Sequence, residues 1–194
     1  MTARAYVPKI SEGEERGKVR TFDDRDSFTQ PAQDLNGRSI VNIENGERIG
    51  HVSNLLFDPE SLRVVGLVSN RGNMGGLGNL LTRDTETFPA SAVEVWGKDV
   101  ILVHTPERMI EEGSPEREKW VDLTAQLKDR YVVSVDGTRV GQVGDVILDK
   151  NGQIVAYSLN QVYVEGPLAE SKRIPAGATH SLGKDVLIVD MSKF

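Results

Sequence analysis

From residue 38 onward the chain alternates short apolar segments with polar turns, at a spacing typical of β-strands. Residues 39–43 alternate apolar and polar side chains, Asn45 and Gly46 follow, and further apolar segments occupy 49–57 and 63–69. Asn-Gly is a strong hairpin signal, because both central residues of a type I′ turn need positive φ. Closely spaced short strands without helical periodicity predict a small all-β barrel.

The strand pattern occurs twice in the chain. The repeat is carried by four pairs of matching segments: 35–38 with 127–130, 46–52 with 137–143, 88–92 with 174–178, and 97–103 with 183–189. A duplicated unit of about seventy residues must satisfy the same backbone twice, so the shared positions are first of all requirements of the fold. Units this small bury a low fraction of their surface. We therefore expect the two copies to pack on each other or on a second chain.

The repeat also predicts a domain organisation in which a linker joins two barrels. The predicted parts are a tail at 1–34, barrel one at 35–104, a linker at 105–126 and barrel two at 127–190. In the linker, Ser114 and Pro115 are typical of the first positions of a helix. We expect a short helix or turn there, with Trp120 packed against a barrel.

The tail is expected to be largely disordered. Residues 11–30 carry ten charged side chains of mixed sign and only Val19, Phe22 and Phe28 to bury. Such a composition cannot offset the entropy that is lost on ordering. The alternative is that Phe22 and Phe28 dock on a partner.

The alternation of apolar residues predicts which side chains fill the two barrel interiors. In barrel one we expect a core of Ile40, Val52, Leu55, Val65, Leu67, Val100 and Leu102. In barrel two we expect a core of Val132, Val143, Val146, Val155, Val186 and Ile188.

Composition narrows the classes of function. The net charge of -6 and the pI near 5.2 disfavour nucleic acid as a partner, because binding to a phosphate backbone depends on cationic side chains. The absence of cysteine excludes disulfides, thiolate metal sites and cysteine nucleophiles. No segment is apolar enough to span a bilayer, and the N-terminus lacks the apolar core of a signal peptide. The expected location is cytoplasmic, and peripheral membrane association stays open.

The sequence predicts no catalytic residue, no cofactor site and no metal site. His51, His104 and His180 are too far apart to show the spacing of metal ligands. Asp149 begins a stretch similar to a calcium loop, but the stretch lacks the glutamate at the twelfth position and is explained by a hairpin turn. The glycine-rich residues 70–79 lack a following Gly-Lys-Ser/Thr and a helix to present amides to phosphate.

The predicted partner contact is the loop at residues 70–81, in a connection that is five residues longer in copy one than in copy two. Long glycine-rich connections in compact domains are either mobile or used for binding. A contact surface would use the apolar side chains of this loop, which are Met74, Leu77, Leu80 and Leu81. A merely mobile connection is the alternative.

The ordered motifs resemble those of the PRC-barrel family, named after the cytoplasmic domain of the photosynthetic reaction-centre H subunit. Copy one supplies Leu35-Asn36-Gly37-Arg38, residues 46–52, Asp58, Phe88-Pro89 and Gly97-Lys98-Asp99-Val100. Copy two supplies Leu127-Lys128-Asp129-Arg130, residues 137–143, Asp149, Ile174-Pro175 and Gly183-Lys184-Asp185-Val186. Copy two has Asp129 where the family has glycine, and aspartate tolerates left-handed φ better than most residues.

The resemblance implies two tandem small PRC-type β-barrels that act in assembly or interaction. The family includes a reaction-centre subunit domain, half of a ribosome maturation factor and small prokaryotic adaptors, and it has no family-wide catalytic residues. We therefore expect a non-enzymatic adaptor or scaffold with an unidentified protein partner, which also self-associates as a homodimer. A factor in ribosome assembly or RNA processing is the alternative, and a basic surface patch would favour it. A small-molecule-binding barrel or enzyme would need a deep pocket with convergent polar groups.

Overall fold

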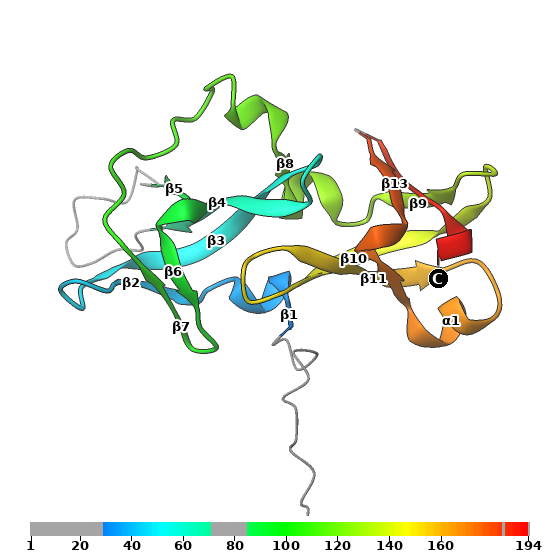
Figure 1. Cartoon of the computed structure of the whole chain (residues 1–194), viewed down its shortest axis with the longest axis horizontal. Coiled ribbons are helices and arrows are strands. Elements are labelled where there is room, and N and C mark those ends of the chain that lie inside the picture. Colours follow the sequence, from blue (N-terminus) through cyan, green and yellow to red (C-terminus); the bar gives the residue numbers. More distant parts are fainter. Residues whose placement is uncertain (1–28, 71–84, 184, 194) are drawn as a thin grey trace, which may run out of the picture.

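The computed structural model describes residues 29–70, 85–183 and 185–193, which form two β-sheets that each curl into a half-barrel (Figure 1). The first sheet contains β2 (Ser39–Asn42), β3 (Arg48–Asp58), β4 (Arg63–Asn70), β5 (Thr85–Pro89), β6 (Val93–Trp96) and β7 (Val100–Val103). The second contains β9 (Tyr131–Ser134), β10 (Arg139–Leu148), β11 (Ile154–Val162), β12 (Arg173–Pro175), β13 (Thr179–Leu182) and β14 (Val186–Val189). Two short strands, β1 (Gln30–Pro31) and β8 (Val121–Asp122), each join one of these sheets. One short α-helix, α1 (Pro167–Ser171), precedes β12.

The two sheets have the same topology, which confirms the predicted duplication and the all-β fold. The strand order is β5-β4-β3-β2-β7-β6 in one sheet and β12-β11-β10-β9-β14-β13 in the other. In both sheets one parallel pair closes the curve, β2 with β7 and β9 with β14, while the remaining neighbours are antiparallel. We call β1 to β7 half one and β8 to β14 half two.

The halves exchange their first strands. β1 of half one pairs with β10 of half two, with Gln30 opposite Leu148, whereas β8 of half two pairs with β3 of half one, with Val121 opposite Phe57. These registers are equivalent, because Phe57 and Leu148 hold the same position in β3 and β10. A pseudo-two-fold axis therefore relates the halves.

The axis passes between Arg63, the first residue of β4, and Gln153, the residue before β11. Arg63 forms an isolated antiparallel bridge with Gln153, its own counterpart in the other half. The Val64 amide donates to the Gly152 carbonyl at 2.8 Å, and the Ile154 amide donates to the Leu62 carbonyl at 2.8 Å. Equivalent residues facing each other is the pattern of an isologous interface between identical subunits.

One hydrophobic core runs through both halves, whereas the sequence predicted a separate core in each barrel. Units this small bury too little surface to be stable alone, which is the physical reason for the shared core. The short helical turns that follow the exchanged strands, Ala32–Leu35 and Leu123–Leu127, insert Leu35 and Leu127 into it, both fully buried. Asp129 follows the second turn with φ of 63°, close to the 77° of Gly37 in half one. The expected tolerance of this aspartate for left-handed φ is confirmed.

The arginine of the repeated motif ties the start of each sheet to its last hairpin. Arg38 Nη1 donates to the Gly97 carbonyl at 2.5 Å and to Gln30 Oε1 at 2.8 Å. Arg130 Nη1 donates to the Gly183 carbonyl in the equivalent hairpin of half two. The motif residues that repeat are thus explained by the fold.

The predicted core is correct in the central strands β2, β3, β9 and β10, wrong in the closing strands β7 and β14, and wrong at one position in each of β4 and β11. Seven of the predicted side chains are buried: Ile40, Val52, Leu55, Leu67, Val132, Val143 and Val146. The other six are half-buried or exposed: Val65, Val100, Leu102, Val155, Val186 and Ile188. The buried side chains are their neighbours Val64, Ile101, Val103, Ile154, Leu187 and Val189. In β7 and β14 the prediction was one residue out of phase, and because side chains alternate between the faces of a strand, every predicted side chain there lies on the other face. In β4 and β11 the cause is a register irregularity, which falls between the pairs Leu56–Gly66 and Phe57–Val64 in β4 and between Ile147–Ala156 and Leu148–Ile154 in β11.

Two boundaries also need correction. Residues 30–34, predicted to belong to a disordered tail, form β1 and most of the turn Ala32–Leu35, while residues 1–28 with Val19, Phe22 and Phe28 lie outside the described residues. Residues 121–126, predicted to belong to the linker, form β8 and most of the turn Leu123–Leu127 of half two. The short helix or turn expected in the linker is the 3₁₀ turn Arg117–Lys119, where the Ser114 hydroxyl accepts from the Arg117 amide at 3.3 Å.

Near the axis, side chains at equivalent positions of the two halves differ in size. Gly152 has φ of 74°, and a Cβ built on it would lie 3.2 Å from the Trp96 ring of half one. Its counterpart Leu62 also has positive φ, 54°, and the counterpart of Trp96 is the smaller Leu182. Gly152 therefore faces the large Trp96 ring. At the equivalent positions, Leu62 of half one takes the place of the glycine and the smaller Leu182 of half two takes the place of the ring.

We expect Gly152→Ala to destabilise the protein by about 2 kcal/mol, because it combines a left-handed backbone with overlap against Trp96. The measurement is the free energy of unfolding in a double-mutant cycle with Trp96→Leu. The cost of Gly152→Ala should fall by at least about 0.5 kcal/mol in the Trp96→Leu background. An equal cost in both backgrounds would show that Trp96 does not constrain this position.

Candidate functional site

The loop predicted as a partner contact cannot be assigned a place in the fold. Met74, Leu77, Leu80 and Leu81 all lie outside the described residues, between the end of β4 and the start of β5. The strand pairings show that the length difference in this connection is smaller than the sequence predicted. Gly66 pairs with Pro89 in half one, and the equivalent Ala156 pairs with Pro175 in half two. Copy one is longer than copy two by four residues here, not by five. The remaining extra residue falls in the turn between β3 and β4.

The three histidines are separate from one another, as their spacing predicts. His51 Nδ1 lies 3.0 Å from the Gly37 carbonyl oxygen, at the start of half one. His104 follows β7 and His180 lies in β13 of the other half. Among the residues that the structure describes, no group of three or more histidines and carboxylates is placed to hold a metal ion.

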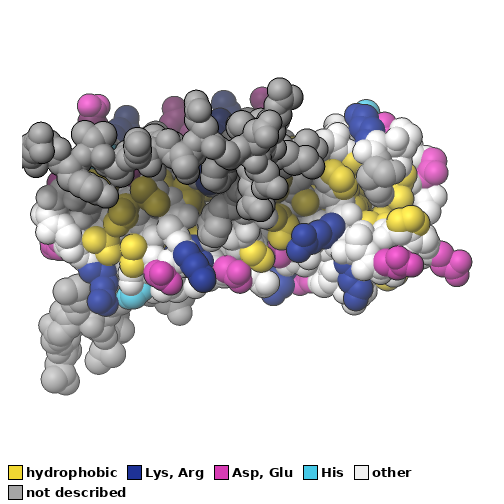
Figure 2. Space-filling model, turned by 60° about the horizontal axis from the view of Figure 1, so that its bottom comes forward, with side chains coloured by type: hydrophobic (Ala, Val, Ile, Leu, Met, Phe, Trp, Pro, Cys, Tyr) yellow, Lys and Arg dark blue, Asp and Glu magenta, His cyan; other side chains and the backbone are white. Residues whose placement is uncertain are grey.

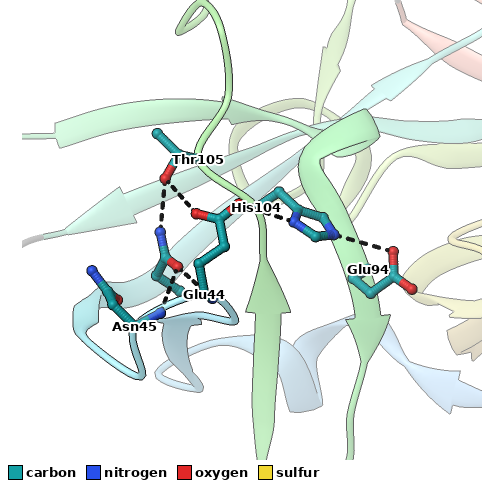
Figure 3. A network of polar contacts seen from close by, with 6 residues as sticks. Glu44, Asn45, Glu94, His104 and Thr105 are labelled. Atoms are coloured by element: carbon teal, nitrogen blue, oxygen red, sulfur yellow. Dashed lines mark hydrogen bonds and ion pairs between the residues drawn. The ribbon is translucent and has the colours of Figure 1, made fainter.

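His104 takes part in a polar network at one end of half one (Figure 3). Its Nδ1 lies 3.2 Å from Glu44 Oε1, and its Nε2 lies 3.5 Å from Glu94 Oε2. The Thr105 hydroxyl donates to Glu44 Oε2 at 3.1 Å and accepts from the side-chain amide Nδ2 of Asn42 at 2.8 Å. Hydrogen bonds from His104 and Thr105 lower the pKa of Glu44. The network joins the hairpin after β2 to the first residues of the linker.

Half two also has an imidazole–carboxylate pair, in which the histidine and the carboxylate have exchanged positions. Glu94 and His104 of half one correspond to His180 and Asp190 of half two. The pKa of Asp190 is lowered, chiefly by hydrogen bonds from Ser192 and to a smaller extent by the charge of His180. The two imidazole nitrogens of His104 face different carboxylates, so His104 links the hairpin after β2 to β6.

A cleft of about 460 Å³ lies between the linker and half one. Its lining residues are Val64, Val65, Pro89, Ala90, Ser91, Arg108, Met109, Ile110, Glu111, Ser114, Glu116 and Trp120. Trp120, which was expected to pack against a barrel, is half-buried and lines this cleft together with residues of half one. The volume is that of a small-molecule site. None of the groups with a shifted pKa, such as Glu44, Asp145 or Asp190, lines it.

Two apolar strips on the outer faces of the parallel strand pairs are the feature that sequence reasoning missed. Strip one consists of Val41, Val95, Val100 and Leu102, and strip two of Tyr131, Val133, Val186 and Ile188. Four of these residues were assigned to the core through the error of phase. The signal in the sequence is that β7 and β14 are apolar at every position, so either phase offers an apolar face.

The strips are exposed and lie toward opposite ends of the molecule. Val95 is 43% exposed, Val100 36% and Tyr131 38%. β7 and β9 lie on either side of the centre of the molecule (Figure 1). Arg139 extends over the Tyr131 ring, with its guanidinium carbon 4.4 Å from the ring centroid. On the face shown in Figure 2, apolar side chains form separate patches among charges of both signs.

Asp145 is the buried carboxylate of the interface between the halves. It lies in β10, is 5% exposed, and accepts a hydrogen bond from the Gln33 amide at 3.2 Å. Burial raises its pKa, and the backbone amides of Gln33 and Val146 only partly oppose this. Half one has Asn54 at the equivalent position, which is neutral at every pH.

We expect Asp145→Asn to raise the melting temperature at pH 7 by a few °C. A folded-state pKa above the unfolded value means that stability is highest below the unfolded pKa and falls as pH rises through the folded pKa. The difference between variant and wild type should therefore shrink as the pH falls to about 4. Thermal unfolding between pH 4 and 7 measures this, with the exposed Glu165→Gln as a control. A less stable Asp145→Asn at pH 7 would mean that the hydrogen bonds to the charged carboxylate outweigh its burial.

The comparisons with known proteins agree with this geometry. None of the helices in the described part of the chain is long and apolar enough to cross a membrane. A search of the curated proteins found no match. The family model described as PRC-barrel domain matches residues 31–110 and again residues 122–193, more than half of the chain. Both matches begin at equivalent residues of the exchanged strands, Pro31 and Asp122. The chain therefore belongs to the PRC-barrel family and contains two copies of its domain in tandem.

Proposed function

We propose that this tandem PRC-barrel protein is a non-enzymatic adaptor or scaffold that binds other proteins, and that the two apolar strips are its contact surfaces. The observation that carries the proposal is the presence of the same outward apolar strip in both halves. Hydrogen bonds within the fold explain the repeated arginines, whereas Val100 and Val186 lie outside the buried core and burial does not explain them. Exposed apolar side chains that cluster beside charged ones are typical of protein interaction sites.

The position of the strips supports binding to more than one partner at once. The pseudo-two-fold axis places them in equivalent surroundings, each on a parallel strand pair and each flanked by an arginine, Arg48 or Arg139. Tyr131 replaces Ser39 at the equivalent position, so strip two has an aromatic side chain that strip one lacks. Aromatic residues and arginine are enriched among the residues that contribute most to binding energy. The strips are therefore expected to differ in partner or affinity.

Self-association belongs to the proposal, because a strip on one chain could pack on a strip of another. Binding through such surfaces needs no reacting groups, and the polar clusters at His104 and His180 serve to join elements. The cleft below the linker has apolar walls and no pair of titratable groups in mutual contact other than the exposed Arg108–Glu111 ion pair. We keep the cytoplasm as the location, an expectation that rests on the sequence.

We expect Val100→Lys and Val186→Lys to weaken partner binding about tenfold while leaving the fold intact, since Val100 is exposed and Val186 is half-buried outside the core. Partners are first identified by affinity purification from the native host and mass spectrometry, and their binding to each purified variant is then measured. Mass in solution is measured by light scattering. Val155→Lys, at a valine that is 37% exposed but lies outside both strips, is the matched control. If both strip variants keep the partners, affinities and mass of the wild type, the strips are not the contact surfaces.

A further inference from the structure

The surface at which the two halves meet has the properties of a subunit interface. It combines two exchanged strands, a bridge between equivalent residues on the axis, and a shared core. Leu35 and Leu127 are fully buried next to it, and Asn54 donates to Asp122 at 2.5 Å across it. Each half therefore supplies the other with a strand, a polar partner and part of its core. These contacts do not involve the apolar strips, so the inference is independent of the proposed function.

The interface favours unlike halves over like halves. If half one met a second half one, Leu62 would replace Gly152 against the Trp96 ring, where even a Cβ would lie at 3.2 Å. Arg63 would also face another Arg63 at the axis, which opposes two like charges. If half two met half two, Gly152 would face Leu182, and the space that Trp96 fills would be left empty. Clashes, like charges and cavities are the means by which an interface rejects a wrong partner.

The covalent connection between the halves lies on the surface. None of the residues from His104 to Trp120 is buried, and Glu111, Glu112 and Gly113 are all exposed. The linker contacts half one through a bridge from Ile110 to Thr87, and the half-buried Met109 packs against the core. The buried contacts of the interface thus do not depend on which chain the linker comes from. A fully extended segment of this length spans roughly 55 Å.

We propose that this interface also accepts a second copy of the chain, with half one of each chain paired to half two of the other. The exchanged dimer forms the same contacts as the monomer twice, including both strand exchanges. Exchange of identical elements between protomers is a low-cost route to a dimer. The balance between monomer and dimer depends on the linker and on protein concentration, because the second half is held at an effective concentration of about 1 mM by a short flexible linker.

The test uses the complete chain with a specific protease site inserted between Glu112 and Gly113. After cleavage, one-to-one pairs of half one and half two should persist at about 1 μM in native mass spectrometry, because the buried contacts are unchanged. Mixing a cleaved isotope-labelled sample with a cleaved unlabelled one should produce mixed pairs of unlike halves. Separation of the halves on cleavage, or a substantial population of pairs of like halves, would overturn the inference.

The uncut chain provides the second measurement. After refolding from denaturant at about 1 mM it should contain a dimer that persists on dilution, whereas refolding at about 1 μM should give monomer, in keeping with the effective concentration. When labelled and unlabelled chains are refolded together, the dimer should contain both. Val100→Lys is the control, since it alters strip one and leaves the interface unchanged, so a dimer built through the strips would be lost in this variant. A chain that refolds only to monomer at both concentrations would show that the interface does not accept a second copy.

Discussion

The backbone pairing of Arg63 with Gln153 fixes the relation between the two halves, and the rest of the structure depends on it. Two hydrogen bonds of 2.8 Å, from Val64 to Gly152 and from Ile154 to Leu62, hold β4 and β11 antiparallel across the axis. With these strands in place, β1 reaches β10 and β8 reaches β3, and the two half-barrels share one core. A single unit of this size buries too little surface to be stable alone, so the pairing is also a condition of stability.

The repeated motifs are explained by this architecture and not by chemistry. Arg38 and Arg130 each bind the carbonyl of the glycine that begins the last hairpin, and Gly37 and Asp129 supply the positive φ that precedes them. The recurring arginines and positive-φ positions therefore close the half-barrels. A function specific to this protein has to be sought among outward-facing side chains and among the positions at which the copies differ.

Those differences fall into two groups with separate consequences. Near the axis, Gly152 opposite Trp96 makes the halves complementary to each other and poorly suited to pairing with themselves. On the outer faces, Tyr131 in place of Ser39 gives strip two an aromatic side chain beside Arg139. The differences near the axis specify how the two halves pair. The differences on the outer faces make the two proposed contact surfaces chemically distinct. A duplicated fold can in this way keep one architecture while its surfaces diverge.

The sequence by itself determined the fold class, the duplication and the family, because these follow from the order of strands, turns and repeated motifs. It also identified the inward side chains of the central strands, such as Val52 and Val143, where polar residues alternate with apolar ones. It could not determine the phase of β7 and β14, since every position of Val100–Val103 and Val186–Val189 is apolar and only the neighbouring strands decide which face is buried. The strand exchange and the axis were likewise decided by tertiary structure, because Gln30–Pro31 and Val121–Asp122 are too short to show a periodic pattern. Their pairing depends on partners more than sixty residues away in the sequence, a relation that local pattern does not contain.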